Sequence, residues 1–173
     1  MNNEFKYGLV AGCGFIIWYL ILFVTNIHNE RPDLFNLTDL IGQAIIMLSI
    51  FAGLYFRKMN MPDFELPFGQ GVRSGMMISF ISSVIIAAFL CLYVNFINVG
   101  YNAAQIIFIK QQMLSAKLSP DVYRQQIQMV EQMFNGSATS VFSILVRLTS
   151  VGVVVSALVS FILRYVRGPK QTV

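Results

Sequence analysis

The amino-acid sequence predicts an all-α protein built as a four-helix transmembrane bundle. Of its 173 residues, 56% are hydrophobic and only 12% are charged, whereas a soluble domain carries about 25% charged residues. Four apolar segments, at residues 7–27, 40–56, 72–99 and 141–166, meet the roughly 17 residues or more that a membrane-crossing helix needs. A chain of this size is expected to form one integral membrane domain, residues 1–173.

The first two predicted spans are separated by a short polar loop. The first span has no charged residue, and its Gly8 and Gly12 form a G-x-x-x-G pair. Such a pair lets the backbone of a neighbouring helix approach closely. The second span is interrupted by the polar side chain of Gln43 and is followed by Arg57 and Lys58, which are expected to end it at the membrane surface.

The third predicted span begins with glycines and continues with serines on one side. Gly71 and Gly75 make a second G-x-x-x-G pair, and the following turns carry the small side chains of Ser79, Ser82 and Ser83. Larger apolar residues would have faced lipid equally well. This small face is therefore expected to pack against a neighbouring helix.

The segment between the third and fourth spans, residues 101–136, is predicted to be helical and to lie outside the bundle. Ser119, Pro120 and Asp121 are a strong helix start, with a cap, a proline in the first position and an early acid. Its apolar side chains recur at helical spacing as a candidate partner-facing stripe, which consists of Tyr123, Ile127, Val130 and Phe134. That stripe must be covered by the bundle, the bilayer surface or another chain. The glutamine-rich, mixed-charge opposite face favours a protein.

The fourth predicted span carries the clearest packing stripe in the chain. Gly152, Ser156 and Ser160 place a small residue at every fourth position. Together with the glycine pairs of the first and third spans, these residues are the candidate helix-packing positions.

The distribution of lysine and arginine predicts the orientation of the bundle. Four spans put both termini on one side, and that side would carry more of the positive charge: Lys6, Arg57, Lys58, Arg73, Arg164, Arg167 and Lys170. The other side would carry Arg31, Lys110, Lys117, Arg124 and Arg147. Because positive charge near span ends stays cytoplasmic, both termini are expected in the cytoplasm and residues 101–136 on the opposite, extracytoplasmic side.

Arg147 is the most informative polar residue within the spans. It is expected in the outer leaflet, where its side chain either snorkels to the lipid phosphates or binds a partner inside the bundle. Asp39 is the carboxylate nearest to it in depth, which suggests a polar cluster of Asp39, Gln43 and Arg147 between the second and fourth spans. Asn95 and Asn98 fall at the same level and complete the candidate outer polar cluster.

The sequence predicts no catalytic, cofactor-binding or metal-binding residues. His28 is the only histidine, and a lone histidine beside a loop is expected to be solvated. The inner halves of the predicted spans offer no pair of titratable groups that would meet in a cavity, so no enzyme is expected. The net charge of +4 is attributed to the ends of the spans, and no nucleic-acid partner is expected.

With these four spans in place, the chain resembles an uncharacterised bacterial inner-membrane family, the domain of unknown function 4199 (DUF4199). The resemblance rests on the length, the four apolar segments, the sequence FGQGVRSG at the entry to the third span, and the Ser-Pro-Asp start of the helix that precedes the last span. It implies a bundle fold in a bacterial inner membrane. It implies no reaction and no functional residue.

Two classes of function stay open at this point. The first is an accessory or scaffold protein of the membrane, with the lipid bilayer around it and a second copy of the chain or another membrane protein as its partner. The second is a small oligomeric transporter or channel with an outer-leaflet polar site around Arg147. An intramembrane enzyme is the least favoured.

Overall fold

The computed structural model describes residues 3–61, 64–115, 119–134 and 138–165, and in these residues the secondary structure is entirely helical. The elements along the chain are α1 (Asn3–Val24), α2 (Ile27–Glu30), η1 (Pro32–Leu34), α3 (Phe35–Met59), α4 (Phe68–Leu92), η2 (Tyr93–Ile97), α5 (Tyr101–Ser115), α6 (Pro120–Phe134) and α7 (Ala138–Tyr165). Four segments are long and apolar enough to cross a membrane: Asn3–Val24, Phe35–Met59, Phe68–Ile97 and Phe142–Tyr165. The predicted all-α, four-span bundle is confirmed.

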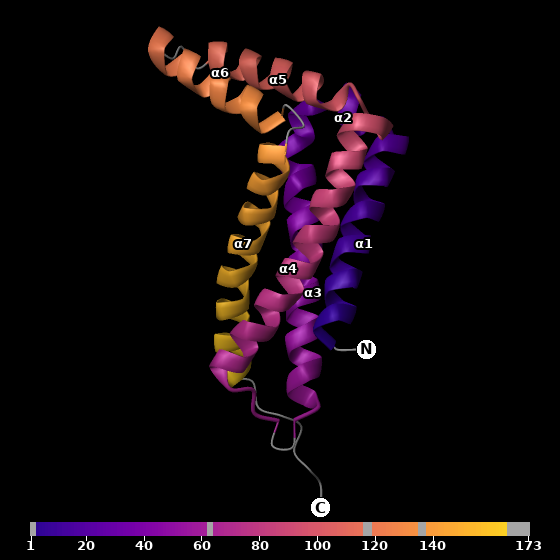
Figure 1. Ribbon diagram of the computed structural model, residues 1–173, viewed down its shortest axis with the longest axis vertical. Helices are drawn as coiled ribbons and strands as arrows, with labels where there is room; N and C mark the ends of the chain where they lie inside the picture. The colour runs from indigo at the N-terminus through magenta and orange to yellow at the C-terminus, as the bar shows by residue number, and fades with distance from the viewer. Residues whose placement is uncertain (1–2, 62–63, 116–118, 135–137, 166–173) are drawn as a thin grey trace, which may run out of the picture.

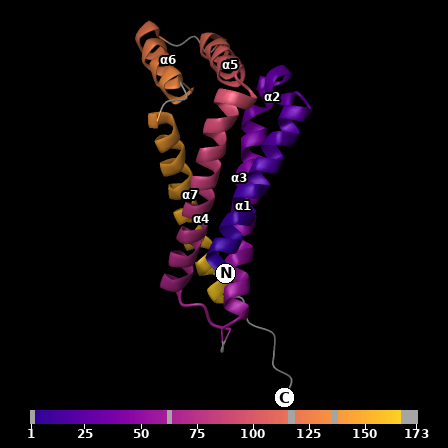
Figure 2. The ribbon, with the colours of Figure 1, turned by 45° about the vertical axis from the view of Figure 1, so that its right-hand side comes forward.

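The four long helices run side by side, with α4 at the centre of the bundle (Figures 1 and 2). Helix α4 packs on α7, α1 and α3, and α3 also contacts α1 and α7. Helix α1 begins and α7 ends at one end of the bundle, here called the terminal end. The opposite end, called the hairpin end, carries α2, α5 and α6.

The spanning helices are longer than the apolar segments that predict them. Helix α1 begins at Asn3 rather than residue 7, and α3 extends from Phe35 to Met59 rather than from 40 to 56. The extra turns contain charged residues, because a helix continues past the hydrocarbon layer until its backbone is capped or turned. The end of the fourth predicted span, residue 166, lies outside the described residues.

Helices α4 and α7 approach each other through small residues on both sides. Three facing pairs run along this antiparallel contact: Gly71 with Ser160, Gly75 with Ser156, and Ser79 with Gly152. A Cβ atom added to any of these glycines would overlap the Oγ atom of the opposite serine. The small-residue stripes of the third and fourth spans are therefore two sides of one contact.

The glycine pair of the first span lies against α4 as well. A Cβ atom on Gly8 would lie 2.7 Å from the Cβ atom of Ile81, and one on Gly12 would lie 2.8 Å from the Cγ2 atom of Ile85. On the α1–α3 side, the indole nitrogen of Trp18 donates a hydrogen bond to the backbone oxygen of Thr38, at 2.9 Å. Both contacts fix α1 against its neighbours.

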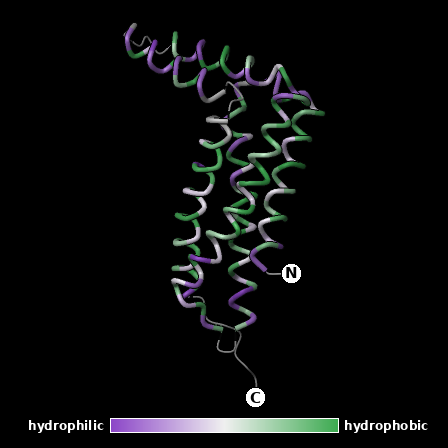
Figure 3. Tube along the Cα trace, in the orientation of Figure 1, coloured by the Kyte–Doolittle hydropathy of each residue, from purple (hydrophilic) through white to green (hydrophobic). Residues whose placement is uncertain are grey.

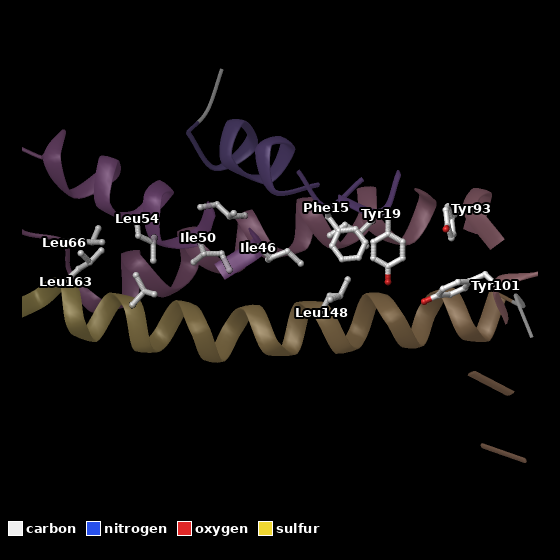
Figure 4. Close-up of a cluster of buried hydrophobic side chains, with 13 residues drawn as sticks. Phe15, Tyr19, Ile46, Ile50, Leu54, Leu66, Tyr93, Tyr101, Leu148 and Leu163 are labelled. Atoms are coloured by element: carbon white, nitrogen blue, oxygen red, sulfur yellow. The ribbon is translucent and has the colours of Figure 1, made fainter. Parts of the chain in front are cut away.

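The core of the bundle is a continuous column of buried side chains. It consists mainly of aliphatic residues toward the terminal end, such as Ile50 and Leu54, and of aromatic residues toward the hairpin end, such as Phe15, Tyr19 and Tyr93 (Figure 4). Hydrophobic residues line the four long helices, whereas hydrophilic residues are frequent in α6 (Figure 3). Buried polar residues lie at both ends of the bundle, with His28 and Asn98 at the hairpin end and Glu4 and Lys58 at the terminal end.

The close approach of α4 and α7 predicts an unequal effect of two glycine substitutions. Gly152→Ala is expected to destabilise the protein by about 1–3 kcal/mol, because the added methyl group must displace Ser79 in a packed contact. Gly69→Ala makes the same change of residue type in helix α4 where nothing lies within 4 Å of the new Cβ atom, and is the matched control. Unfolding in mixed micelles followed by circular dichroism measures both, and equal stabilities would contradict this account.

Candidate functional site

The polar residues of the hairpin end are organised around His28 on the short helix α2. Asn26 adopts a left-handed backbone conformation with φ of 59°, which ends α1 and turns the chain back over the bundle. The turn carries the ring of His28 into the core, where only 3% of the residue is exposed. The expectation of a solvated histidine is wrong, because the turn places His28 among the aromatic residues of α1, η2 and α5.

His28 is hydrogen-bonded to Tyr93 in the interior of this end. The Nδ1 atom of His28 lies 2.6 Å from the hydroxyl oxygen of Tyr93. The side-chain amide of Asn98 donates to the same hydroxyl oxygen at 3.1 Å and to the Oδ1 atom of Asn29 at 3.2 Å. Asn98 donates to the Tyr93 oxygen, so the Tyr93 hydroxyl can donate to Nδ1 in the tautomer of His28 that carries its proton on Nε2.

A π-helical turn at the end of α4 allows this network to form. Residues Tyr93–Ile97 make up η2, and the backbone N–H of Asn98 donates to the oxygen of Tyr93 at 2.7 Å. Short π-helical turns within α-helices are frequent at functional positions. Here the wider turn brings the side chains of Tyr93 and Asn98 together at the top of the bundle, although they lie five residues apart.

Three tyrosine rings enclose the imidazole of His28. The ring centroids of Tyr19 and Tyr101 each lie 4.9 Å from that of His28, and the centroid of Tyr93 lies at 5.7 Å. Burial lowers the pKa of His28 from 6.5 to about 4, and burial raises the pKa of Tyr101 above its ordinary value. The network is therefore uncharged at neutral pH, and it joins α5, through Tyr101, to α1, α2 and η2. We call His28, Tyr19, Tyr93, Tyr101 and Asn98 the aromatic latch.

Asp39, Gln43 and Arg147 come together on the side of the bundle between α3 and α7. The Nη2 atom of Arg147 donates to the Oδ2 atom of Asp39 at 3.1 Å, and the Nε2 atom of Gln43 donates to the same oxygen at 2.8 Å. The side chain of Asp39 is 21% exposed and that of Arg147 is 62% exposed. The Arg147 side chain is thus the more exposed member of this ion pair.

The other two residues of the predicted outer polar cluster lie elsewhere. Asn98 belongs to the aromatic latch, and Asn95 is exposed and donates to the backbone oxygen of Cys91, one turn earlier in its own helix, at 2.7 Å. The five residues shared a predicted depth, but depth alone did not specify which side of the bundle each one faces.

The terminal end holds a second polar group that the sequence analysis did not anticipate. Glu4 is buried and accepts hydrogen bonds from Arg57 and, at 3.0 Å, from the hydroxyl of Ser74. The ammonium group of Lys58 donates to the backbone oxygen of Leu163 at 2.5 Å. The prediction that the inner halves of the predicted spans bring no titratable groups together in a cavity did not extend to Glu4 and Arg57. These residues lay outside the predicted spans, and the longer helices bring them into contact.

The predicted partner-facing stripe of α6 lies partly within the chain itself. Helix α6 packs on α5, and Tyr123, Ile127 and Val130 are half-buried, as is Gln126. The side chain of Phe134 lies outside the described ones. An ion pair between Lys110 of α5 and Glu131 of α6, at 2.7 Å, ties the two helices together.

The described residues contain no group of three or more histidine, cysteine, aspartate or glutamate side chains arranged to hold a metal ion. Cys13 is exposed and Cys91 is half-buried, and both are free thiols.

A family model described as a protein of unknown function, DUF4199, matches residues 6–165 of the chain. The chain belongs to this family. No curated protein and no solved structure is significantly similar to it. The match takes in all four spans, the aromatic latch and the α5–α6 hairpin of this DUF4199 protein.

The latch residues of this DUF4199 protein had only weak signals in the sequence. Tyr93 and Tyr101 flank the polar positions around Gly100, where the third span was expected to end. A tyrosine on each side of such a break has an apolar ring and a hydroxyl that needs a partner, and His28 is the one imidazole available in the sequence.

Removing the hydroxyl of Tyr93 is expected to loosen the hairpin end. Tyr93→Phe leaves Nδ1 of His28 and the amide of Asn98 without their shared partner in the interior, which costs about 1–3 kcal/mol. Hydrogen exchange of residues 101–115 should accelerate accordingly. Tyr165→Phe, at a tyrosine that is 70% exposed, is the control, and equal exchange in both variants would contradict the role given to the latch.

The latch is also expected to weaken in acid. When the latch is open, His28 is solvated and takes up a proton below about pH 6.5, whereas in the closed latch the imidazole stays neutral down to about pH 4. The free energy that favours the closed latch should therefore fall by up to about 3 kcal/mol between these pH values, at about 1.4 kcal/mol per pKa unit. Exchange of residues 101–115, corrected for its intrinsic pH dependence, measures the loss. In His28→Gln the exchange of residues 101–115 should no longer depend on pH in this range. If the pH dependence is unchanged in this variant, groups other than His28 cause it.

Proposed function

We propose that this DUF4199 protein is a non-catalytic accessory component of a bacterial inner membrane, which self-associates through its α5–α6 hairpin. The proposal rests mainly on one observation. The hairpin runs across the axis of the bundle and extends past α7 (Figures 1 and 2), where it adds little to the packing of the four spans.

The outer surface of the hairpin carries large apolar side chains. Ile107 and Leu114 on α5 are 57% and 64% exposed, and Val122 and Met129 on α6 are 40% and 52% exposed. The hairpin lies beyond the candidate spans, so these side chains are not accounted for by contact with the lipid tails. Exposed apolar groups outside the hydrocarbon layer are typical of interaction surfaces.

The charges of the hairpin favour a protein over a lipid surface. Helices that lie on a membrane carry a strongly basic polar face, whereas here Lys110 pairs with Glu131 and the remaining exposed positions are rich in glutamine. A second copy of the chain offers the same mixture of apolar and uncharged polar groups. A symmetric contact between two hairpins therefore satisfies both copies at once.

The same proposal includes an orientation. Lysine and arginine are more frequent toward the terminal end, which supports a cytoplasmic location for both termini. The aromatic latch and the hairpin then lie on the extracytoplasmic side, where the hairpin would meet a second copy.

The transport alternative has less support. The charge of Arg147 is offset by Asp39 at 3.1 Å, which weakens its attraction for a diffusing anion. The core between the helices is filled by buried side chains such as Ile46, Ile50 and Ile86. A passage would then have to lie between copies rather than within one.

A cysteine introduced as Ser115→Cys at the end of α5 tests both parts of the proposal in a variant that lacks Cys13 and Cys91. In intact cells, a maleimide that cannot cross the membrane should label it from outside, and a short bifunctional maleimide should join two copies. Adding Leu114→Lys and Met129→Lys should reduce that joined product roughly tenfold, since two buried apolar contacts are lost.

The matched control adds the same charges beside the apolar positions, as Gln112→Lys and Gln128→Lys, and should leave cross-linking unchanged. If the cysteine is labelled only after lysis, the hairpin lies in the cytoplasm and the proposed orientation is wrong. A monomer in mild detergent together with no joined product in cells would overturn self-association.

A further inference from the structure

We propose that the terminal end of the bundle binds the headgroups of anionic phospholipids through Lys6, Arg73 and Arg164. Binding at this surface does not depend on self-association, because the terminal end lies opposite the α5–α6 hairpin (Figure 1). Three features of the terminal end support it: an excess of positive charge, three cations that have no carboxylate beside them, and the position of these cations on the spanning helices.

The charges of the described residues are divided unequally between the two ends of the bundle. At the terminal end the cations outnumber the carboxylates, with Lys6, Arg57, Lys58, Arg73 and Arg164 against Glu4 and Glu65. Toward the hairpin end the carboxylates are the more numerous, with Glu30, Asp33, Asp39, Asp121 and Glu131 against Arg31, Lys110, Arg124 and Arg147. The terminal end therefore has a net positive charge and attracts anions.

Most of the cations toward the hairpin end are neutralised within the chain. Three of the four cations described there pair with a carboxylate at 2.7–3.1 Å: Arg31 with Asp33, Lys110 with Glu131, and Arg147 with Asp39. A carboxylate at this distance offsets most of the field that a cation would exert on a more distant anion. These residues therefore leave little positive charge for an external partner.

At the terminal end, two cations are bound within the chain and three are not. Arg57 pairs with Glu4, and the ammonium group of Lys58 donates to the backbone oxygen of Leu163. The other three are exposed, and within the described part of the chain they take part in no ion pair: Lys6, Arg73 and Arg164. The counter-charge of these three groups therefore comes from outside the chain.

Each unpaired cation lies near the end of a spanning helix. Lys6 is the fourth residue of α1, Arg73 is the sixth residue of α4, and Arg164 is the penultimate residue of α7. Long cationic side chains at such positions extend to the headgroups of the bilayer. Arg164 is also followed by the exposed Tyr165, a residue type that is enriched at the membrane surface. The three charges are therefore expected at the depth of the lipid phosphates.

The helix sides that carry Arg73 and Lys6 favour a lipid over a soluble acidic partner. Met77 and Phe80 follow Arg73 by four and seven residues, and Val10 follows Lys6 by four, so each shares a helix side with its cation. These three apolar side chains are each about half exposed and belong to candidate spans. A cation directly above lipid-facing side chains meets the headgroups of the same lipids, whereas a soluble partner would need the charges on a surface that faces water.

Native mass spectrometry of the full-length protein in a non-ionic detergent tests this surface, with phosphatidylglycerol and phosphatidylcholine of identical acyl chains offered together. Because the chains are identical, any preference reports the headgroup alone. The protein should bind phosphatidylglycerol about fivefold more tightly, as expected for contact with one lysine or arginine. The triple variant Lys6→Gln, Arg73→Gln, Arg164→Gln should lose this preference, whereas Lys6→Arg, Arg73→Lys, Arg164→Lys should keep it because the charge is unchanged.

The matched control removes three cations from the other end, as Arg31→Gln, Lys110→Gln, Arg124→Gln, and should keep the full preference. Equal binding of the two lipids to the unmodified protein, or a preference that survives in the terminal glutamine variant, would overturn the proposal. So would an equal loss in the control, because net charge rather than position would then decide binding. A soluble oligoglutamate peptide that binds as tightly as phosphatidylglycerol, and is lost in the terminal glutamine variant, would assign these cations to a soluble acidic partner instead.

Discussion

The close contact between α4 and α7 is the constraint on which the rest of this structure depends. In a bilayer the surrounding lipid tails are as apolar as the helix surfaces, so helices associate through shape and dispersion rather than through the hydrophobic effect. A glycine or serine at every fourth position on both helices removes the side chains that would hold them apart. The register of the contact is then set, because each glycine must face a serine, and a shift by one residue would bring larger side chains into the gap.

From this contact the other elements follow. Helix α1 also packs on α4, through Gly8 and Gly12, so α4 lies at the centre of the bundle. With α7 drawn onto α4, Arg147 is carried to the edge of α3, where it meets Asp39. The α4–α7 contact therefore accounts for a tight interface and a specific ion pair in the same molecule.

The two ends of the bundle treat their buried polar groups differently. At the hairpin end the network around His28 consists of neutral groups, and burial keeps it so by lowering the pKa of the imidazole. At the terminal end, Glu4 and Arg57 are brought together as a pair of opposite charges, joined by Ser74. A neutral network costs less to desolvate, whereas a charge pair depends on a partner at close range. The neutral network lies among aromatic rings at the hairpin end, and the charge pair lies at the terminal end, beside the membrane surface.

Much of the fold is predictable from the sequence, because apolar length and the spacing of small residues are local properties. Residues such as Gly75 and Ser156 were recognisable as packing positions, although their pairing across the bundle required the structure. Asp39 and Arg147 could be matched by depth, since counting along a helix gives height in the membrane. His28 could not, because its position depends on the left-handed turn at Asn26 and the π-helical turn after Tyr93, and neither has a distinctive sequence. Glu4 and Arg57 were missed because hydropathy ends a span before the helix ends.

Helices α3 and α7 are fastened to each other near both extremities, by Asp39 with Arg147 at one and by Lys58 with the backbone of Leu163 at the other. Splaying or scissoring of α3 against α7 would have to break one of these two contacts, so the pair of contacts opposes both motions.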